Sequence, residues 1–334
     1  MLIRAGIVLA ALLLPLSLLS GCGRVVAGAA LPQVADNGPS SYRRALSAQE
    51  QERLAMSDRV RELDACGFVN QAAIATLGAP VYFGQGQDFD SCILRFKPSI
   101  GPSRIYAVEI NTGQRDTETP PTMIDGVPVR LRPADGCMAT VPYPVRDFVF
   151  WVKGRDNSNT CSEATAFVRA ALPMLKSKPL RAQSQRVLDT PLARLDPCAA
   201  VSVIGKNKPR LQVETGLRPY YCKFTLDSSD ETTSQNIAYT QKTLEMLEWA
   251  RKDGKVYGVR SGQMQINRGS QNSPSGYCSA DFYPNVGSPN IRNFTGDADS
   301  HGPEHWVDVV DMSTLAGCAA LQRTAEAILE FYGK

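Results

Sequence analysis

The positions of its nine cysteines limit the folds open to this chain more than any other feature of its sequence. Cys22 stands alone near the start, and the other eight fall into two sets of four. The first set is Cys66, Cys92, Cys137 and Cys161, and the second is Cys198, Cys222, Cys278 and Cys318. Two successive sets of this kind indicate an internal repeat of roughly 130 to 150 residues, so we predict a tandem duplication.

The residues around matching cysteines agree better than the gaps between them. An aspartate stands two residues before the first cysteine of each set, as Asp64 and Asp196. The second and third cysteines lie in alternating apolar and polar runs, which are typical of β-strands. After Cys161 and Cys318, apolar residues recur at helical spacing, so each of these cysteines is expected to begin a helix.

The first 22 residues predict export and attachment to a membrane through lipid. After Arg4, the apolar stretch 5–19 is shorter than the roughly 20 residues of a membrane-spanning helix, but it suits the core of a signal peptide. It ends at Leu19-Ser20-Gly21-Cys22, which resembles the bacterial lipobox. Cleavage before Cys22 would leave a thiol and an amine that accept acyl chains, and two or three chains hold a protein stably on a membrane. The alternative is an ordinary secretory signal in which Cys22 is incidental.

The rest of the chain divides into a tether and two modules. Residues 23–47 contain many small residues, Gly and Pro without periodicity, which favours a flexible linker over an edge strand or a packed loop. Residues 47–63 are compatible with a short helix. We therefore predict a signal peptide at 1–21, a lipidated cysteine and tether at 22–55, and four-cysteine modules at 56–180 and 181–334.

The eight cysteines of the modules are expected to form disulfides, because an exported chain lives in an oxidising compartment. Four cysteines in a module allow three connectivities. We favour pairing the first with the second and the third with the fourth, since the first and fourth are expected on helices and the others on strands. The favoured pairs are Cys66–Cys92, Cys137–Cys161, Cys198–Cys222 and Cys278–Cys318. Metal binding by these cysteines is disfavoured, because the sequence has no Cys-x-x-Cys pair and no Cys/His cluster.

The pattern between the cysteines predicts an α+β fold with two tandem modules. The predicted strands are 105–110, 127–131, 138–143 and 148–152 in the first module, and 256–260, 263–267, 277–283 and 306–310 in the second, where an amphipathic helix is inserted at 243–252. Turn signals separate these strands, as in antiparallel hairpins. Each module is therefore expected to have an antiparallel sheet covered by N- and C-terminal helices that two disulfides pin to it.

These landmarks together resemble a family of secreted actinobacterial lipoproteins of unknown function that carry a four-cysteine α+β module. The second repeat is closer to the family pattern, because it has Pro197 between Asp196 and Cys198, where the first has Ala65. In the first repeat, neither strand cysteine has a tryptophan two residues later, so the family's usual Cys-x-Trp motif is missing there. More distantly, the module is similar to the extracellular sensor domain of mycobacterial serine/threonine kinases. The resemblance implies an envelope location and a binding or sensing role, and it supplies no catalytic residues.

Residues suited to catalysis or metal binding are scarce. The two histidines, His301 and His305, lie in one polar segment with Asp297 and Asp299. Imidazole and carboxylate groups this close together are the best metal candidates in the chain. Gly302-Pro303 and the high polarity favour a surface loop instead, so no metal, cofactor or catalytic residue is predicted.

Two further features are given structural interpretations. Residues 84–87, Gly-Gln-Gly-Gln, lack the spacing of a dinucleotide-binding loop and are expected to be a mobile connection. The three tryptophans, Trp151, Trp249 and Trp306, fit buried packing better than a ligand groove.

The sequence thus favours a binding protein over an enzyme. A net charge of +3 spread without runs excludes the usual footprint of a nucleic-acid binder. The leading hypothesis is a noncatalytic, lipid-anchored protein on the extracytoplasmic face of the cell membrane, which binds an envelope lipid, a cell-wall component or a protein. The alternatives are an envelope lipid carrier with an apolar cavity and a hydrolase that uses the His301/His305 segment.

Overall fold

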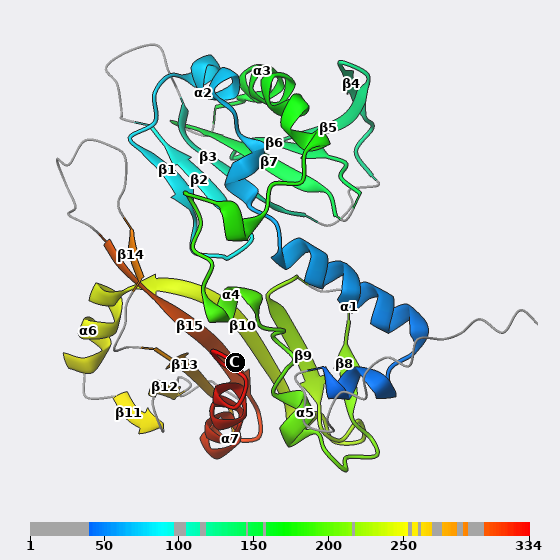
Figure 1. Ribbon diagram of the computed structural model, residues 1–334, viewed down its shortest axis with the longest axis vertical. Helices are drawn as coiled ribbons and strands as arrows, with labels where there is room; N and C mark the ends of the chain where they lie inside the picture. Colours follow the sequence, from blue (N-terminus) through cyan, green and yellow to red (C-terminus); the bar gives the residue numbers. More distant parts are fainter. Residues whose placement is uncertain are drawn as a thin grey trace, which may run out of the picture. The chain divides into compact units, whose positions relative to one another are not determined.

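Two antiparallel β-sheets make up the folded chain in the computed structural model, each with helices on its core face, and the second carries a further helix on its other face (Figure 1). The structure describes residues 40–96, 105–113, 118–144, 146–155, 158–215, 218–252, 256–259, 262–268, 276–285, 290–292 and 304–334. Antiparallel sheets with helices packed on one face place the chain in the α+β class that the sequence predicts.

The first sheet has seven strands among the described residues. They are β1 (Tyr82–Gln85), β2 (Cys92–Arg95), β3 (Ile105–Thr112), β4 (Thr122–Ile124), β5 (Val127–Ala134), β6 (Gly136–Val141) and β7 (Phe148–Gly154). Neighbours in the sheet follow the order β1-β2-β3-β7-β6-β5-β4. Alternate residues of β7, Phe148, Phe150 and Val152, are buried towards the helices, because side chains alternate between the two faces of a sheet.

The second sheet, as far as the structure describes it, repeats this order with one strand added. Its strands are β8 (Gln212–Glu214), β9 (Tyr221–Thr225), β10 (Ser234–Thr243), β11 (Val256–Val259), β12 (Gly262–Arg268), β13 (Cys278–Tyr283), β14 (Asn290–Arg292) and β15 (Glu304–Thr314). The order in the sheet is β8-β9-β10-β15-β13-β12-β11, and β14 pairs with β15 outside this row. With β14 left aside and strands numbered along the chain, both sheets read 1-2-3-7-6-5-4, as expected for a duplicated unit.

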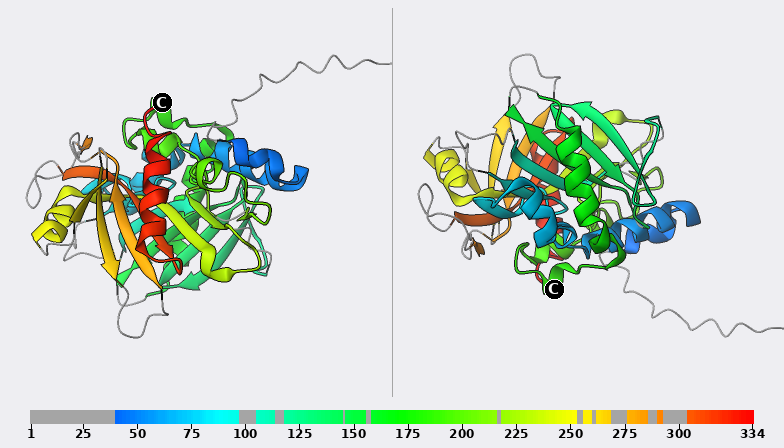
Figure 2. Two further views of the ribbon diagram at one scale, coloured as in Figure 1. Left: turned by 90° about the horizontal axis from the view of Figure 1, so that it is seen from below. Right: turned by 90° about the horizontal axis from the view of Figure 1, so that it is seen from above.

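A helix that begins at a cysteine covers each sheet. α3 (Cys161–Ala171) lies against the first sheet and α7 (Cys318–Leu329) against the second (Figure 2). On α3, Ala164, Phe167 and Val168 are fully buried, which is the spacing of one helix face. The other helical elements are η1 (Ser41–Ala45), α1 (Ala48–Arg61), η2 (Ala65–Phe68), α2 (Gln71–Leu77), η4 (Leu172–Lys176), η5 (Arg181–Gln183), α4 (Pro191–Arg194), α5 (Val201–Ile204), η6 (Glu231–Thr233) and α6 (Leu244–Lys252).

Four disulfide bonds join the cysteines of the described chain, each within its own set. They are Cys66–Cys92, Cys137–Cys161, Cys198–Cys222 and Cys278–Cys318, the pairs favoured from the sequence. In each sheet one bridge links the sixth strand to the first residue of the covering helix. The bridges span 24 to 40 residues. Closing loops of this length stabilises a fold by about 3–4 kcal/mol per bridge when no strain opposes it.

The sequence places the first cysteine of each set on a helix, and the structure agrees only in part. Cys66 lies on the short 3-10 helix η2, whereas Cys198 lies in the turn before α5. The aspartate two residues earlier explains both turns. The side chain of Asp64 accepts a hydrogen bond from the Cys66 N–H at 2.8 Å, and that of Asp196 accepts one from the Cys198 N–H at 2.9 Å. The Asp64 contact caps the start of η2, and the Asp196 contact forms an Asx turn, so each cysteine is held beside its strand partner.

The beginning of the described chain is helical and packs with the second sheet. α1 starts at Ala48, where Ser47 and Glu50 form a capping box. The helix agrees with the short helix expected within residues 47–63, and it includes residues 48–55, which the predicted domain division assigned to the tether. Tyr42 and Leu54 are buried in the hydrophobic core of the second sheet, so this segment is packed on the body and is not the flexible tether that the sequence predicts.

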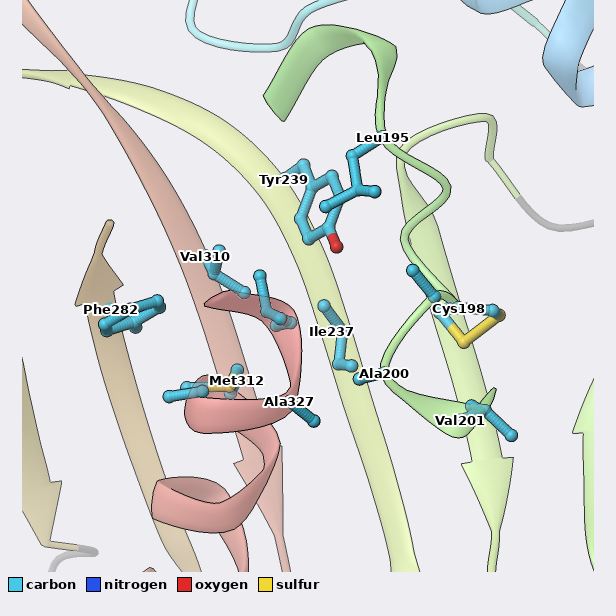
Figure 3. Packing of buried hydrophobic residues seen from close by; sticks show 14 of the residues in the cluster. Leu195, Cys198, Ala200, Val201, Ile237, Tyr239, Phe282, Val310, Met312 and Ala327 are labelled. Atoms are coloured by element: carbon cyan, nitrogen blue, oxygen red, sulfur yellow. A yellow bond between two sulfur atoms is a disulfide. The ribbon is translucent and has the colours of Figure 1, made fainter. Parts of the chain in front are cut away.

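Each sheet has its own hydrophobic core. Beneath the first sheet, the rings of Phe68 and Phe148 lie 4.4 Å apart, and those of Phe150 and Phe167 lie 6.2 Å apart. All four phenylalanines are fully buried. In the second core, Ile237 and Met312 on neighbouring strands lie close to Ala327 of α7 (Figure 3).

The turn between β1 and β2 joins the first sheet to the second. The N–H of Gln241 in β10 donates to the carbonyl of Gln87 at 2.9 Å, and Asp88 pairs with Thr240 as a β-bridge. Phe89 is fully buried in the second core, 5.2 Å from the ring of Tyr220. Residues Asn37–Lys334 accordingly form one compact unit.

Residues 84–87 are not the mobile connection expected from the sequence. Gln85 ends β1 and is fully buried. Its amide NH2 donates to the side-chain oxygen of Gln241 at 3.1 Å, and its amide oxygen accepts from the Leu188 N–H at 2.9 Å. A buried amide needs partners of this kind. They lie more than 100 residues further along the chain, so a local sequence pattern does not reveal them.

Candidate functional site

The second sheet has a polar face on the side opposite α7. Ala280 and Phe282 of β13 are buried in the core, so Asp281 between them lies on the other face. The same alternation places Lys242 of β10 and Asp311 of β15 on that face. These three residues are called the Lys242 triad below.

The triad is held together by short polar contacts. The Lys242 ammonium lies 2.8 Å from Oδ2 of Asp281 and 2.9 Å from Oδ1 of Asp311. The Thr240 hydroxyl donates to the other oxygen of Asp311 at 2.9 Å. The side chains of Lys242, Asp281 and Asp311 are 22%, 18% and 35% exposed. The group is therefore sheltered but still reaches solvent.

The two carboxyl groups of the triad control each other's protonation. They face each other in register across β13 and β15 and share a hydrogen bond. Burial, together with the hydrogen bond and charge of Asp311, raises the pKa of Asp281 to about 6, although Lys242 acts to lower it. Burial also acts to raise the pKa of Asp311, but the hydrogen bond with Asp281 and the charge of Lys242 hold it below its ordinary value. Asp281 is therefore the first of the pair to take up a proton as the pH falls.

The first sheet has no such group at the equivalent positions. Asp281 stands three residues after Cys278, and the residue three after Cys137 is Thr140. Opposite Thr140 in the register of the first sheet is Val149, where the second sheet has Asp311. The triad is thus a property of the second sheet and not of the repeated scaffold.

The triad combines hydrogen-bond donors and acceptors at one sheltered but solvent-accessible position on the sheet. When both carboxylates are ionised, its formal charge is −1. Asp281 and Asp311 stand directly opposite each other across β13 and β15, where like charges repel, and the Lys242 ammonium offsets that repulsion. The same ammonium and carboxylate groups can also bind hydroxyl or amide groups of a ligand that lies on the sheet. The described face therefore offers a place for a polar ligand.

Asp281→Asn is expected to remove a pH-dependent part of the stability. Because the folded pKa of Asp281, about 6, lies above the value near 3.9 of an unfolded aspartate, its contribution is complete below about pH 4 and is lost as the pH rises through 6. Asparagine is neutral throughout. The free energy of unfolding of the variant minus that of the wild type should therefore rise by about 1–3 kcal/mol between pH 4 and pH 7. Urea titrations across this range measure the difference.

Asp311→Asn provides the matched control. It removes the neighbouring charge that raises the pKa of Asp281 and leaves the Lys242 contact in place. The pH dependence assigned to Asp281 should therefore shrink in this variant as well. A difference between Asp281→Asn and wild type that stays flat from pH 4 to pH 7 would contradict the assignment.

Most residues singled out from the sequence as lipid or metal sites lie outside the described residues. These are Cys22, Asp297, Asp299 and His301. His305 lies in β15 with its backbone opposite Ile291 of β14, so it belongs to a strand and not to the expected surface loop. Within the described residues, no group of three or more His, Cys, Asp or Glu side chains is arranged to hold a metal ion.

The three tryptophans have different surroundings, although the sequence favoured burial for all. Trp306 is buried, and the Trp151 indole N–H donates to the carbonyl of Asp135 at 2.7 Å. Trp249 of α6 is 65% exposed, so the prediction of burial is wrong for it. The apolar packing of α6 is made instead by Leu247, which is fully buried.

Sequence reasoning missed the Lys242 triad. Its lysine lies on β10, a strand that the sequence did not predict. Asp281 was the one sign of the triad in the sequence, because it alternates with apolar residues in a predicted strand and so points to the polar face. Its partners, Lys242 and Asp311, come from other strands, so the sequence does not show that the three meet.

In the described residues, no helix is both long enough and apolar enough to cross a membrane.

Comparisons with known proteins identify no relative of this chain. No family model, no curated protein and no solved structure matches the chain, so the resemblance to the four-cysteine lipoprotein family stays a prediction from the sequence.

Proposed function

We propose that this chain is a noncatalytic, lipid-anchored protein of the cell envelope that binds a ligand at the polar face of its second sheet. The observation that carries the location is the pairing of the cysteines. Eight of the nine form bridges within the folded body, which leaves Cys22 alone at the lipobox. Disulfides in this number support an oxidising compartment, where a lipobox cysteine receives its acyl chains.

The binding role is supported by the difference between the two sheets. Both have the same strand order and the same two bridges, so the scaffold itself does not require the Lys242 triad. The ligand class is an envelope lipid, a cell-wall component or a protein with polar groups that reach Lys242 and Asp311.

The packing of the cores supports a ligand on the surface over one inside. Phe68, Phe148, Phe150 and Phe167 fill the layer between the first sheet and α3. In the second core, Phe282, Met312 and Ile328 are likewise buried between the sheet and α7. These layers are occupied by the protein's own side chains, which is the ordinary state of a close-packed interior.

One series of variants in an actinobacterial host tests both parts of the proposal. Wild type should carry acyl chains on Cys22, measured as the mass of the N-terminal peptide, and should enter the detergent phase. Cys22→Ser, expressed behind an ordinary cleavable secretory signal in place of residues 1–21, should leave that phase almost completely, because it then has neither the acyl chains nor the apolar stretch 5–19. Isolated cell envelopes should still retain the Cys22→Ser protein through its ligand. Adding Lys242→Met should lower that retention roughly tenfold, as for a central binding contact.

Lys223→Met is the control for the binding measurement. Lys223 is on β9 of the same face and pairs with Glu214 at 2.5 Å, and both side chains are exposed. Its replacement should leave envelope retention unchanged. Unmodified Cys22 in the wild type would contradict the anchor. Equal retention of the Lys242 and Lys223 variants would contradict the binding face. Hydrolysis of an ester, peptide or glycan that a point substitution abolishes would contradict a noncatalytic role.

A further inference from the structure

Helix α6 lies on the polar face of the second sheet and is fastened there by a small apolar cluster. Leu247 is fully buried against Tyr283, Val307 and Val309. The cluster occupies the same face as the Lys242 triad, since Tyr283 is two residues after Asp281. α6 is therefore held firmly by one side.

The opposite side of α6 presents two large apolar side chains. Trp249 is 65% exposed and Met246 is 49% exposed. Residues three apart in a helix are neighbours on its surface, so the two side chains form one patch. Trp249 is two positions after Leu247, about 200° around the helix axis, and thus points away from the sheet.

The formal charges of α6 cancel. Glu245 and Glu248 lie in its first half, and Arg251 and Lys252 at its end. All four are exposed. A surface that binds this helix would therefore be held by the apolar side chains and not by net charge.

The length of the chain between Cys22 and Ser40 shows that the bilayer holding a lipid on Cys22 lies close to the folded body. Seventeen residues, 23–39, separate Cys22 from the start of the described chain, and extended they span at most roughly 60 Å. A compact unit of the size of Asn37–Lys334 has a diameter of roughly 50 Å. A lipid on Cys22 therefore allows faces well away from Ser40 to approach the bilayer. It also keeps the bilayer at a high effective concentration, so that a weak contact is sufficient.

We propose that Trp249 and Met246 insert into the headgroup region of the bilayer that anchors the chain. Tryptophan is enriched at this depth, because its ring is apolar and its N–H can remain hydrated. The inference rests on the lipid anchor of the proposed function, and it adds a second, reversible contact to it.

The test uses the mature chain 22–334 with its disulfides intact. Its Cys22 thiol is coupled to a maleimide lipid in phosphatidylcholine vesicles, so that the tether is present whatever the host attaches. Lipids with a quencher near the headgroup should then quench part of the tryptophan fluorescence. Trp249→Phe should remove that quenched part. Raising the salt concentration from 0.05 to 0.5 M should not change it.

Met246→Ser and Met123→Ser form a matched pair of variants. Met123 of β4 is also largely exposed, at 62%, but lies on the first sheet. Met246→Ser should lower the ratio of inserted to free helix about fivefold, while Met123→Ser should leave it unchanged. Because both side chains are exposed, neither change should unfold the protein, and thermal melts monitor this.

Three results would overturn the inference. They are the absence of quenching in the tethered protein, an equal loss in both methionine variants, and a dimer in solution that Trp249→Ala abolishes. The last would assign the patch to a second copy of the chain. Failure of the anchor is distinguished because it shows as an unmodified Cys22 in the host, whereas the vesicle experiment supplies its own tether.

Discussion

Arg181→Ala is expected to lower the free energy of unfolding by about 3–5 kcal/mol, because it removes a buried cation that serves three backbone acceptors at once. Arg181 is 2% exposed. Its guanidinium donates to the carbonyls of Arg61 at 3.2 Å, Leu188 at 2.9 Å and Phe89. These acceptors belong to the end of α1, the segment between the sheets and the β1–β2 turn. One side chain thus ties together the three segments that meet between the sheets.

Two further variants separate this role from a general effect of charge. Arg181→Lys keeps the charge but not the planar fork of donors, so its loss should be intermediate. Lys178→Ala removes a nearby cation whose pair with Glu62, at 3.0 Å, is exposed on both sides. Such pairs contribute about 0–1 kcal/mol. Urea unfolding followed by tryptophan fluorescence measures all three variants. A loss in Arg181→Ala no greater than that in Lys178→Ala would contradict the assigned role.

Asp196→Ala is expected to cost about 3–4 kcal/mol, whereas Asp64→Ala should cost about 1–2 kcal/mol. Both aspartates accept a hydrogen bond from the N–H of a cysteine two residues on, at 2.9 Å and 2.8 Å respectively. Asp196 also accepts from the Tyr42 hydroxyl at 2.8 Å and forms an ion pair with Arg43 at 2.5 Å. The loss of these extra contacts makes up the difference.

Trypsin cleavage of the N-terminal segment provides a second measurement, because it shows which part of the chain loosens in each variant. Arg43 would keep Asp58, at 2.6 Å, but would lose its link to the second sheet. Residues 41–61 should therefore become sensitive to trypsin in Asp196→Ala and remain protected in Asp64→Ala. Equal losses of stability in the two variants, or equal cleavage, would show that the N-terminal segment does not depend on Asp196.

The elements that the sequence predicted best are those defined by local pattern and cysteine position together. α3 and α7 begin at Cys161 and Cys318 as expected, because apolar spacing defines a helix face and the cysteine marks its start. The bridges followed from the same reasoning, since a cysteine on a strand and one at a helix start suit a link between layers.

β10 escaped prediction although it is central to the second sheet. Its inward residues include Gln235 and Gln241, both buried, which interrupt the apolar alternation expected of a strand. Their amides have partners elsewhere: Thr324 donates to Gln235 at 2.7 Å, and Gln241 donates to Asp308 at 3.0 Å. Buried polar groups with distant partners are invisible to local periodicity, and the Lys242 triad was missed together with its strand.

The path of the chain has a mechanical consequence. Tyr42 and Leu54 pack in the core of the second sheet. In chain order, however, the strands of the first sheet follow them, and those of the second sheet come last. A pull on the N-terminal end therefore loads the contact between Tyr42, Arg43 and Asp196 first. The first sheet carries no force until these contacts break. A force applied at the N-terminal end of the described chain is therefore borne by the second sheet before the first.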